Sequence, residues 1–412
     1  MSSKATITAV VLAAVVIIAA IAVVWTSGHG YDGGNTDQTE DTVTDALGRT
    51  VAIPDNLDNG IVTIGSTGPL RFASMFDVFD HIIEVDRGDI TDSKNGRGYS
   101  YAFAYDSLDP STQSHPDNAL DSSTVESLVK KGPSLVITTE SVWKNYSVNF
   151  GILAGQCTVV VLKDQQMQYM TDGDGGLADY FEFNVDLLGQ VLKKEDRASE
   201  IISGIEEILS DLRSISGTSD QNVYIAGVTI SGSNTLNTTF PVYIPFDLTG
   251  TSNAYHGSTE NKVVLRVEAF TTMDIDMMIV DPSSSDKVGE ADSQYLMEYV
   301  YRLNSDSDPS NDIPIYITVP IVWDSVNYDC ALASSYYVAH LVHGCLTDQE
   351  VEDRIVHIFE VFYGEEHGSG VFDDMREFFD GKSSANGQEM PLLQEVVIEY
   401  DASAGEYRFA AA

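Results

Sequence analysis

The chain has 412 residues, of which 43% are hydrophobic and 21% charged, so it is long enough for two domains with cores of their own. It contains 22 Lys and Arg residues and 63 Asp and Glu residues, which give a formal net charge of −41 at pH 7. A surface this acidic repels nucleic acid and anionic lipid, and we expect no nucleic-acid partner. The acidic residues are spread along the chain, which indicates a solvated acidic surface rather than an acidic tail.

The N-terminal segment, residues 1–25, contains an apolar run of membrane length. Residues 5–25 carry no charge, and such a run can cross about 30 Å of hydrocarbon as a helix. Lys4 is the only charge before it, which predicts a cytoplasmic N-terminus. The run is interpreted as a retained membrane anchor or a cleaved signal segment, followed by a polar linker at residues 26–42. In either case the body of the protein is expected outside the cytoplasm.

The next part, residues 43–176, is predicted to form an α/β lobe. It opens with a hairpin at residues 43–56 around a turn that contains Gly48. Buried strands are then predicted at residues 60–66, 81–86, 134–138 and 158–162, and amphipathic helices separate them. This alternation is typical of a parallel sheet covered by helices on both faces.

Residues 177–217 are predicted to be almost continuous helix, because apolar residues recur at spacings of three and four from Ile201 to Ile215. The α/β alternation then resumes over residues 218–412, with strands predicted at 222–230 and 312–320, a helix and strand within 267–281, mostly helix over 331–379, and a terminal hairpin. We therefore predict an α/β fold of two Rossmann-like lobes joined by a single long helix, with a ligand cleft between the lobes.

The order of five segments resembles a known family. These segments are TDALGRTVAIP, GIVTIGS, TVESLVKKGPSLVI, VEAFTTMDIDMMIVD and NYDCALASSYYVAHLVHG. Over residues 43–381 the chain resembles the class III substrate-binding proteins of ABC importers, the group that captures ferric siderophores, haem and cobalamin, and in particular its archaeal iron-chelate binders. Ser134 stands where the family usually has Asp.

The resemblance implies an extracytoplasmic receptor that captures a metal chelate and delivers it to a membrane permease with a cytoplasmic ATPase. The chelate would be cargo, and we expect no resident cofactor, no enzymatic activity and a monomer. The resemblance also implies one acidic residue on each lobe that docks onto the permease. By position in the motifs these are Glu126 and Glu268, and such charge pairs would fix the register of docking.

Candidate ligand-binding residues in the first lobe follow from the scarcity of basic residues. Arg71 lies just inside the helix predicted after the turn at residues 66–69, where free backbone N–H groups favour an anion. Arg97 lies in a loop beside Tyr99 and Tyr101, which could hold an anionic or aromatic chelate by hydrogen bonds and stacking. Trp143 follows the strand predicted at residues 134–138.

Candidates in the second lobe lie in loops that follow predicted strands, the usual place for a site in an open α/β sheet. Asn234, Thr235 and Tyr243 belong to the loop at residues 231–246. Trp323 and Tyr328 follow the strand that ends at residue 320.

The sequence also permits other functions. A receptor of this fold could bind a bare oxyanion such as molybdate or tungstate. A sensor ectodomain is disfavoured because no second membrane span or signalling domain follows. A metal-dependent hydrolase would use His340 and His343, which share a helical face, but no third ligand and no HExxH pattern is evident. Cys157, Cys330 and Cys345 form no metal-binding spacing, and free thiols are expected, with a Cys330–Cys345 disulfide as the alternative.

Overall fold

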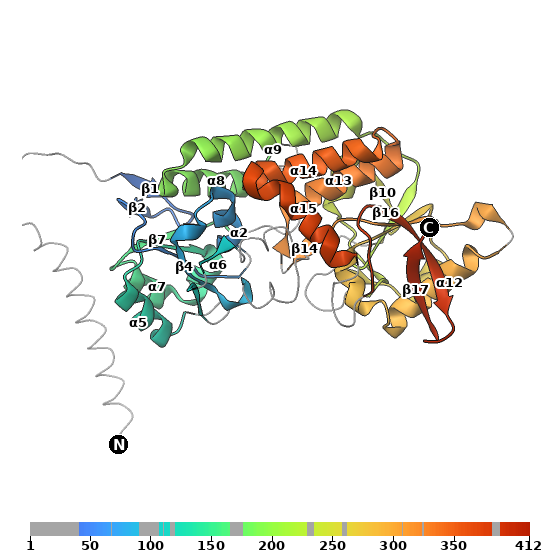
Figure 1. Ribbon diagram of the computed structural model, residues 1–412, viewed down its shortest axis with the longest axis horizontal. Coiled ribbons are helices and arrows are strands. Elements are labelled where there is room, and N and C mark those ends of the chain that lie inside the picture. The colour runs from blue at the N-terminus through green and yellow to red at the C-terminus, as the bar shows by residue number, and fades with distance from the viewer. Residues whose placement is uncertain are drawn as a thin grey trace, which may run out of the picture. The chain divides into compact units, whose positions relative to one another are not determined.

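The computed structural model describes residues 41–412 except 67, 90–106, 110, 116–119, 165–175, 229–234, 258–261, 307, 324 and 381–387. The predicted anchor and the candidates Arg97, Tyr99, Tyr101 and Asn234 therefore lie outside the described residues. Within these ranges no helix has the length and apolarity needed to span a membrane. Residues 42–412 form one unit, whose described residues contain two large sheets and three two-stranded ones (Figure 1).

The chain enters this unit through the predicted hairpin. β1 (Thr42–Thr44) pairs antiparallel with β2 (Thr50–Ala52). Gly48 in the turn has a φ of 73°, a conformation that glycine adopts at little cost. The Asp45 carboxylate accepts the N–H groups of Leu47 at 3.0 Å and Arg49 at 3.1 Å, so the side chain stabilises the turn that the sequence predicts.

The first sheet has five parallel strands in the order β5-β4-β3-β6-β7. All residues of β3 are buried, because helices cover both faces of this sheet. The four strands predicted here are present. Its strands are β3 (Ile61–Thr63), β4 (Ile82–Asp86), β5 (Gln113–His115), β6 (Leu135–Thr139) and β7 (Thr158–Leu162), and its helices are α2 (Pro69–Ala73), α5 (Ser122–Lys131), α6 (Glu140–Asn145) and α7 (Ser147–Leu153).

The helix predicted as almost continuous from residue 177 is two helices, α8 (Asp179–Leu192) and α9 (Glu195–Ile215). The break falls at Lys193, whose φ of 56° is left-handed and ends α8. The two helices pack against each other, and α9 also contacts helices that belong with the second sheet. The almost continuous helix that was predicted is thus interrupted at Lys193, and the 21-residue helix α9 is the long helix that runs along both sheets (Figure 1).

The second sheet has the order β10-β8-β12-β13-β16-β17, in which the first four strands are parallel and the last two antiparallel. The predicted terminal hairpin thus extends the edge of the sheet. Its strands are β8 (Asn222–Ala226), β10 (Ser252–Asn253), β12 (Met277–Val280), β13 (Ile315–Ile317), β16 (Gln394–Asp401) and β17 (Glu406–Ala411).

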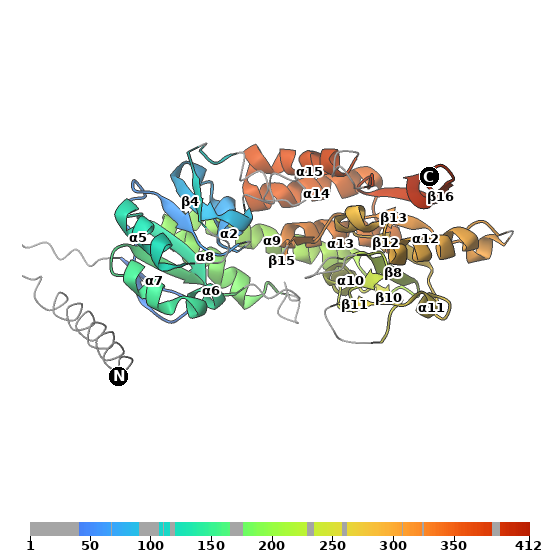
Figure 2. The same ribbon diagram turned by 90° about the horizontal axis from the view of Figure 1, so that it is seen from below.

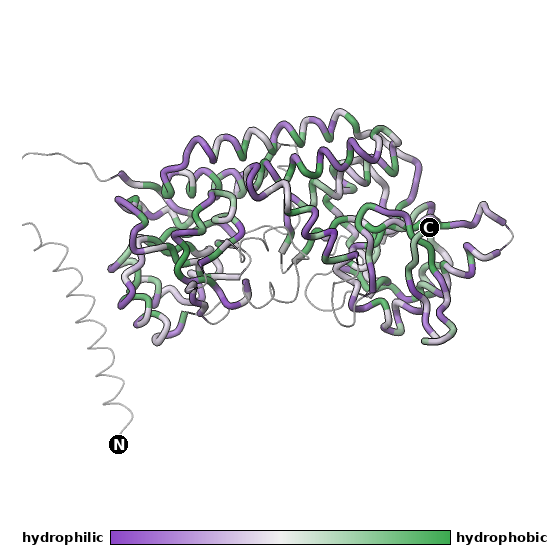
Figure 3. The backbone as a smooth tube through the Cα atoms, viewed as in Figure 1, coloured by the Kyte–Doolittle hydropathy of each residue, from purple (hydrophilic) through white to green (hydrophobic). Residues whose placement is uncertain are grey.

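Six helices accompany the second sheet, and two short antiparallel ladders lie beside it. The helices are α10 (Ile244–Thr249), α11 (Val267–Phe270), α12 (Ala291–Leu303), α13 (Tyr328–His343), α14 (Asp348–Tyr363) and α15 (Glu365–Phe379). The ladders pair β9 (Thr238–Thr239) with β11 (Val263–Val264) and β14 (Val322–Trp323) with β15 (Ser325–Val326). Hydrophobic residues concentrate in the strands, whereas α9 alternates hydrophilic and hydrophobic residues (Figure 3).

Arg197 of α9 ties segments of both halves together. Its Nε donates to the Met75 carbonyl at 3.1 Å, in the turn after α2, and its Nη2 donates to the Val361 carbonyl of α14 at 2.7 Å. Figure 2 shows α9 passing behind both groups of elements. The strands of the first sheet come from residues 61–162 and those of the second from residues 222–411, which fits the predicted lobes; their limits at residues 176 and 217 stay a prediction.

Candidate functional site

The first half of the candidate site is built on the loop after β3. Gly65 has a φ of 115°, and its N–H donates to the Asp86 carboxylate at 3.2 Å. Asp86 is fully buried at the end of the neighbouring strand β4 and also accepts the N–H of Gly88 at 3.0 Å. This carboxylate therefore holds the turn that leads into α2, where Pro69 occupies the start of the helix and Arg71 follows.

The second half is built in the same way on the loop after β13. Asp281 is fully buried at the end of β12, and its carboxylate accepts the N–H of Ser283 at 2.9 Å and the N–H of Ile321 at 3.3 Å. Burial raises the pKa of Asp281 to about 6, and the hydrogen bonds from Ser283 and Ile321 oppose that rise. Asp281 thereby positions the segment that leads through β14 and β15 into α13.

Arg71 and Val326 bring these two halves together. The Nη1 of Arg71 donates to the Val326 carbonyl at 3.3 Å, and Arg71 is only 2% exposed. Arg71 follows the carboxyl end of β3, and Val326 follows the carboxyl end of β13. The carboxyl ends of the parallel strands of the two sheets, where open α/β sheets bind their ligands, are thus connected by a buried guanidinium group.

Asn327, next to Val326, is the N-cap of the 16-residue helix α13, but its side chain makes no capping hydrogen bond. An asparagine at this position normally accepts a backbone N–H of the first turn. Asn327 is fully buried, and neither atom of its side-chain amide has a hydrogen-bond partner within the described part of the chain. A buried amide without partners is costly, and it calls for an explanation such as a ligand.

Two tyrosines complete the contact between α8 and α13. The hydroxyl groups of Tyr180 and Tyr328 are hydrogen-bonded, and Phe181 packs edge-on against Tyr328 with ring centroids 5.5 Å apart. The pKa of Tyr180 is raised far above its usual value, mainly by burial and next by Tyr328, while the charge of Arg71 opposes the rise. Arg71 therefore lies close enough to this pair to act on it electrostatically.

The resulting site combines features that stabilise a negative charge. A buried guanidinium, the donor side of an unpartnered amide and the positive end of a long helix dipole occur within a few residues of one another. Asp329, in the first turn of α13, adds a buried negative charge, and the Tyr363 hydroxyl donates to its carboxylate at 2.5 Å. The arrangement suits binding of an anionic group.

The other described ligand candidates occupy varied places. Trp143 is half-buried, stacks on Phe150 with ring centroids 5.1 Å apart, and lies under the Arg49 guanidinium at 3.9 Å. Thr235 and Tyr243 are buried in the second half, where Tyr243 packs edge-on against Phe246. Trp323 ends β14, and its side chain lies outside the described structure. Of the predicted set, the structure brings Arg71 and Tyr328 to the same site, and ligand contact by every member of the set stays a prediction.

The two histidines point to separate partners. His340 Nδ1 lies 2.8 Å from the Leu346 carbonyl and His343 Nε2 lies 2.8 Å from the Thr249 carbonyl. A search of the described residues finds no group of three or more His, Cys, Asp or Glu side chains that could hold a metal ion. All three cysteines are free, so the alternative of a Cys330–Cys345 disulfide was wrong.

Sequence reasoning missed Asn327 and the two buried aspartates. The signal for Asn327 was its position as the first residue of the segment NYDCALASSYYVAHLVHG, just before a long helix. Asp86 ends β4 and Asp281 directly follows β12, but among 63 acidic residues in the chain the sequence does not mark which ones are buried. Only the tertiary structure separates these two from the solvated majority.

The fold is that of two-lobed periplasmic solute-binding proteins. The chain is similar to a periplasmic solute-binding protein from Veillonella parvula, with a TM-score of 0.56 and 15% identity over 82% of this chain and 97% of that one. It is also similar to the molybdate-bound periplasmic binding protein of Haemophilus influenzae, with a TM-score of 0.51 and 15% identity over 78% and 98% of the two chains.

A third similar structure is an ABC transporter solute-binding protein from Sulfurospirillum deleyianum, with a TM-score of 0.50 and 14% identity over 81% of this chain and 99% of that one. No protein-family model and no curated protein matches the sequence. At these identities the similarity establishes the fold alone.

Proposed function

We propose that the protein is the extracytoplasmic solute-binding component of an ABC importer and delivers its ligand to a membrane permease. Three observations support this. The fold is that of two-lobed solute-binding proteins, the carboxyl ends of both sheets meet at a buried polar site, and the sequence begins with an apolar run that would place the body outside the cytoplasm.

The observation that carries the proposal is that Arg71 donates to the carbonyl of Val326, the residue directly before Asn327 at the start of α13. Both side chains are buried, and a buried cation beside an amide without partners is suited to an anionic ligand group. We propose a metal chelate as the ligand, namely a ferric siderophore, haem or a corrinoid. An anionic group of the chelate would lie against Arg71 and Asn327, and Arg97, Tyr99 and Tyr101 would contact its body.

A bare oxyanion such as molybdate or tungstate is the second candidate. The specific observation in its favour is the similarity to the molybdate-bound protein of Haemophilus influenzae. Arg71 and Asn327 offer a small number of buried donors, which also suits a compact ligand. Both candidate ligands would place an anionic group at the same site, and they differ in the size of the rest of the molecule.

Docking to the permease would use Glu126 and Glu268. Glu126 lies on α5 and Glu268 on α11, one helix from each half, and both side chains are exposed. Exposed carboxylates on two separate helices could form ion pairs with basic residues of a permease and set the orientation of docking.

Calorimetric titration of the purified full-length chain against ferric chelates, haem, cobalamin, molybdate and tungstate tests this proposal. We expect saturable binding of one class, and we expect Asn327→Asp to weaken binding of an anion at least tenfold, because it adds a negative charge beside the ligand without changing side-chain size. Asn311→Asp, at an exposed turn, is the matched control and should leave the affinity unchanged. Equal affinity in the two variants would contradict the assignment of the site.

A further inference from the structure

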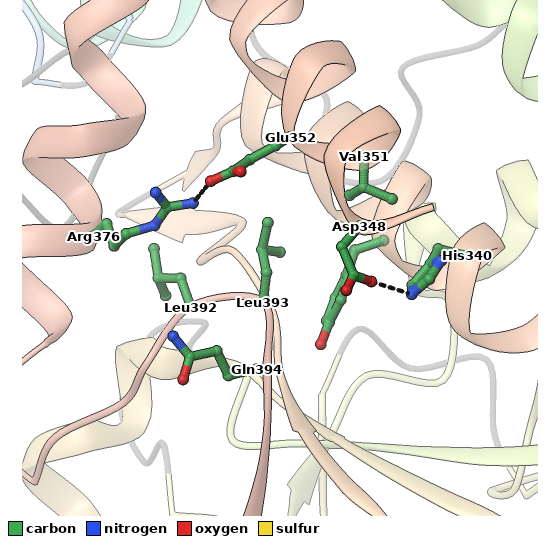
Figure 4. A pocket seen from close by; sticks show the side chains of 9 residues that line it. His340, Asp348, Val351, Glu352, Arg376, Leu392, Leu393 and Gln394 are labelled. Atoms are coloured by element: carbon green, nitrogen blue, oxygen red, sulfur yellow. Dashed lines mark hydrogen bonds and ion pairs between the residues drawn. The ribbon is translucent and has the colours of Figure 1, made fainter. Parts of the chain in front are cut away.

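A second pocket lies away from the Arg71 site, between α13, α14, α15 and the start of β16. Its volume is about 340 Å³, within the range of sites that take small molecules. Leu392 and Leu393 form an apolar part of its lining. The His340–Asp348 contact and the Arg376–Glu352 ion pair lie along its sides (Figure 4).

Leu393 is held in an unusual backbone conformation at this pocket. Its φ of 59° is left-handed, a region that residues with a branched side chain rarely adopt. The hydrogen bond from its N–H to the Ile317 carbonyl of β13, at 2.9 Å, keeps it there. Strained residues persist where the surrounding structure determines them, and they occur preferentially at functional sites.

The charges around the pocket leave a net negative environment. The Arg376 guanidinium is neutralised by Glu352 and by Asp373, which lies 3.8 Å away. The pKa of Tyr337 is raised well above its usual value, mainly by burial and further by the neighbouring Tyr316, Asp348 and Glu395, of which the two carboxylates are negatively charged. A group with a positive charge is therefore favoured beside Tyr337.

The pocket also presents polar groups without partners. Within the described residues, neither the Tyr337 hydroxyl nor the Gln394 side-chain amide makes a hydrogen bond, and both residues line the pocket. The Asp348 side chain is 99% exposed, and one of its carboxylate oxygens lies 3.2 Å from the His340 Nε2. Two oxygen acceptors and a carboxylate, next to an aromatic ring and two leucines, match a small cation with N–H donors and an apolar body.

The geometry points to a second binding site for a compact organic cation, an alkylguanidinium or alkylammonium compound, in the pocket between Tyr337, Asp348 and Leu393. The cationic group contacts the Asp348 carboxylate and the Tyr337 hydroxyl, and the alkyl part contacts Leu392 and Leu393. This site is independent of the proposed anion site, because none of its residues belongs to the cluster around Arg71.

The test is NMR titration of the purified full-length chain with n-propylguanidinium chloride, with n-propylurea as the neutral probe of the same shape. We expect saturable shifts of signals from the pocket residues with the guanidinium compound and at least tenfold weaker binding of the urea. Asp348→Asn should weaken binding of the guanidinium compound roughly tenfold, because it removes the charge from the main acceptor.

Asp353→Asn is the matched control, since Asp353 is also exposed on α14 but does not line the pocket. It should bind the guanidinium compound like the unaltered chain, which excludes a general attraction of cations to the acidic surface. Absence of saturable binding, equal binding of the urea, or equal losses in Asp348→Asn and Asp353→Asn would each overturn the inference.

Discussion

Arg71 and Val326 are separated by 255 positions in the chain and joined by a hydrogen bond of 3.3 Å from a guanidinium that is almost fully buried. Arg71→Met keeps the length and apolar stem of the side chain but leaves the Val326 carbonyl without this donor. We expect the free energy of unfolding to fall by about 1–3 kcal/mol, as for other buried hydrogen bonds to charged groups. Urea denaturation measures it.

Arg71→Lys serves as the control, because lysine retains the charge and one donor. It should recover part of the lost stability, and it should also recover part of the affinity for an anionic ligand. If Arg71→Met were as stable as the unaltered protein, the hydrogen bond to Val326 would contribute nothing to the contact between the two halves.

The hydroxyl pair Tyr180–Tyr328 should show energetic coupling. Each single change to phenylalanine leaves one buried hydroxyl without its partner and should cost about 1–2 kcal/mol. The double change removes both groups and should cost less than the sum of the two single changes. A double-mutant cycle by urea denaturation measures this, and Tyr295→Phe, at a residue 57% exposed, should be neutral. Additive losses would argue against the bond.

Asp281 should make stability depend on pH. Its pKa is raised to about 6 in the folded protein, above the ordinary value of 3.8, so the folded state takes up a proton before the unfolded state as the pH falls. The unaltered protein should therefore gain stability relative to Asp281→Asn between about pH 7 and pH 4, by at most about 3 kcal/mol, since one pKa unit corresponds to about 1.4 kcal/mol. Denaturant titrations at several pH values measure the difference.

The opposite slope would mean that Asp281 is a carboxylate stabilised in its charged form by Ser283 and Ile321. Asp308→Asn is a useful control, because Asp308 is exposed and its pKa is lowered by hydrogen bonds from Ser310. Its contribution should change with pH in the reverse direction.

The net charge of −41 should make the protein more stable in salt. Mutual repulsion of the acidic side chains opposes compaction, and raising the ionic strength from about 0.1 M to about 1 M shortens the screening length from about 10 Å to about 3 Å. We expect the melting temperature to rise over this range of NaCl, measured by calorimetry. Sucrose at matched osmolality controls for solvent exclusion, and an equal rise in sucrose would argue against charge screening.

The three free thiols should react at different rates. Cys345 is exposed, Cys330 is fully buried, and burial raises the pKa of Cys157 to about 11, which leaves little thiolate near neutral pH. A thiol reagent at pH 8 should therefore modify one thiol rapidly, and Cys345→Ser should abolish that phase. After denaturation without reductant three thiols should react, and a count of one would reveal a disulfide.

The alternation of strands and helices could be predicted because the central strands of both sheets are buried on two faces and are short apolar runs bounded by glycine, proline or polar residues. β3 and β7 illustrate this, as does the hairpin around Gly48. The break between α8 and α9 could not be predicted, because the left-handed residue at the break is Lys193 and not a glycine, and no proline marks the position. Helix α12 was also missed, since tyrosines and charges obscure its apolar spacing.

The candidate site was predictable only in part. Arg71 was found because it follows a glycine-containing turn after a strand, and Tyr328 because it follows the strand β13. The role of Asn327 depends on its burial and on the absence of a capping bond, and both are tertiary properties. Arg71 and Asn327 lie far apart in the sequence. That Arg71 reaches the residue before Asn327 can therefore be recognised only in the tertiary structure.

The position of Arg197 has a consequence for transport. This one side chain binds carbonyl groups of Met75 and Val361, so rotation of one half against the other would have to break or stretch bonds from a half-buried guanidinium. If the protein is the solute-binding component that we propose, a receptor restrained in this way would present nearly the same outline whether loaded or empty. Its transporter would then have to recognise cargo through small local changes near the ligand, and an empty receptor would compete with a loaded one for the same docking surface.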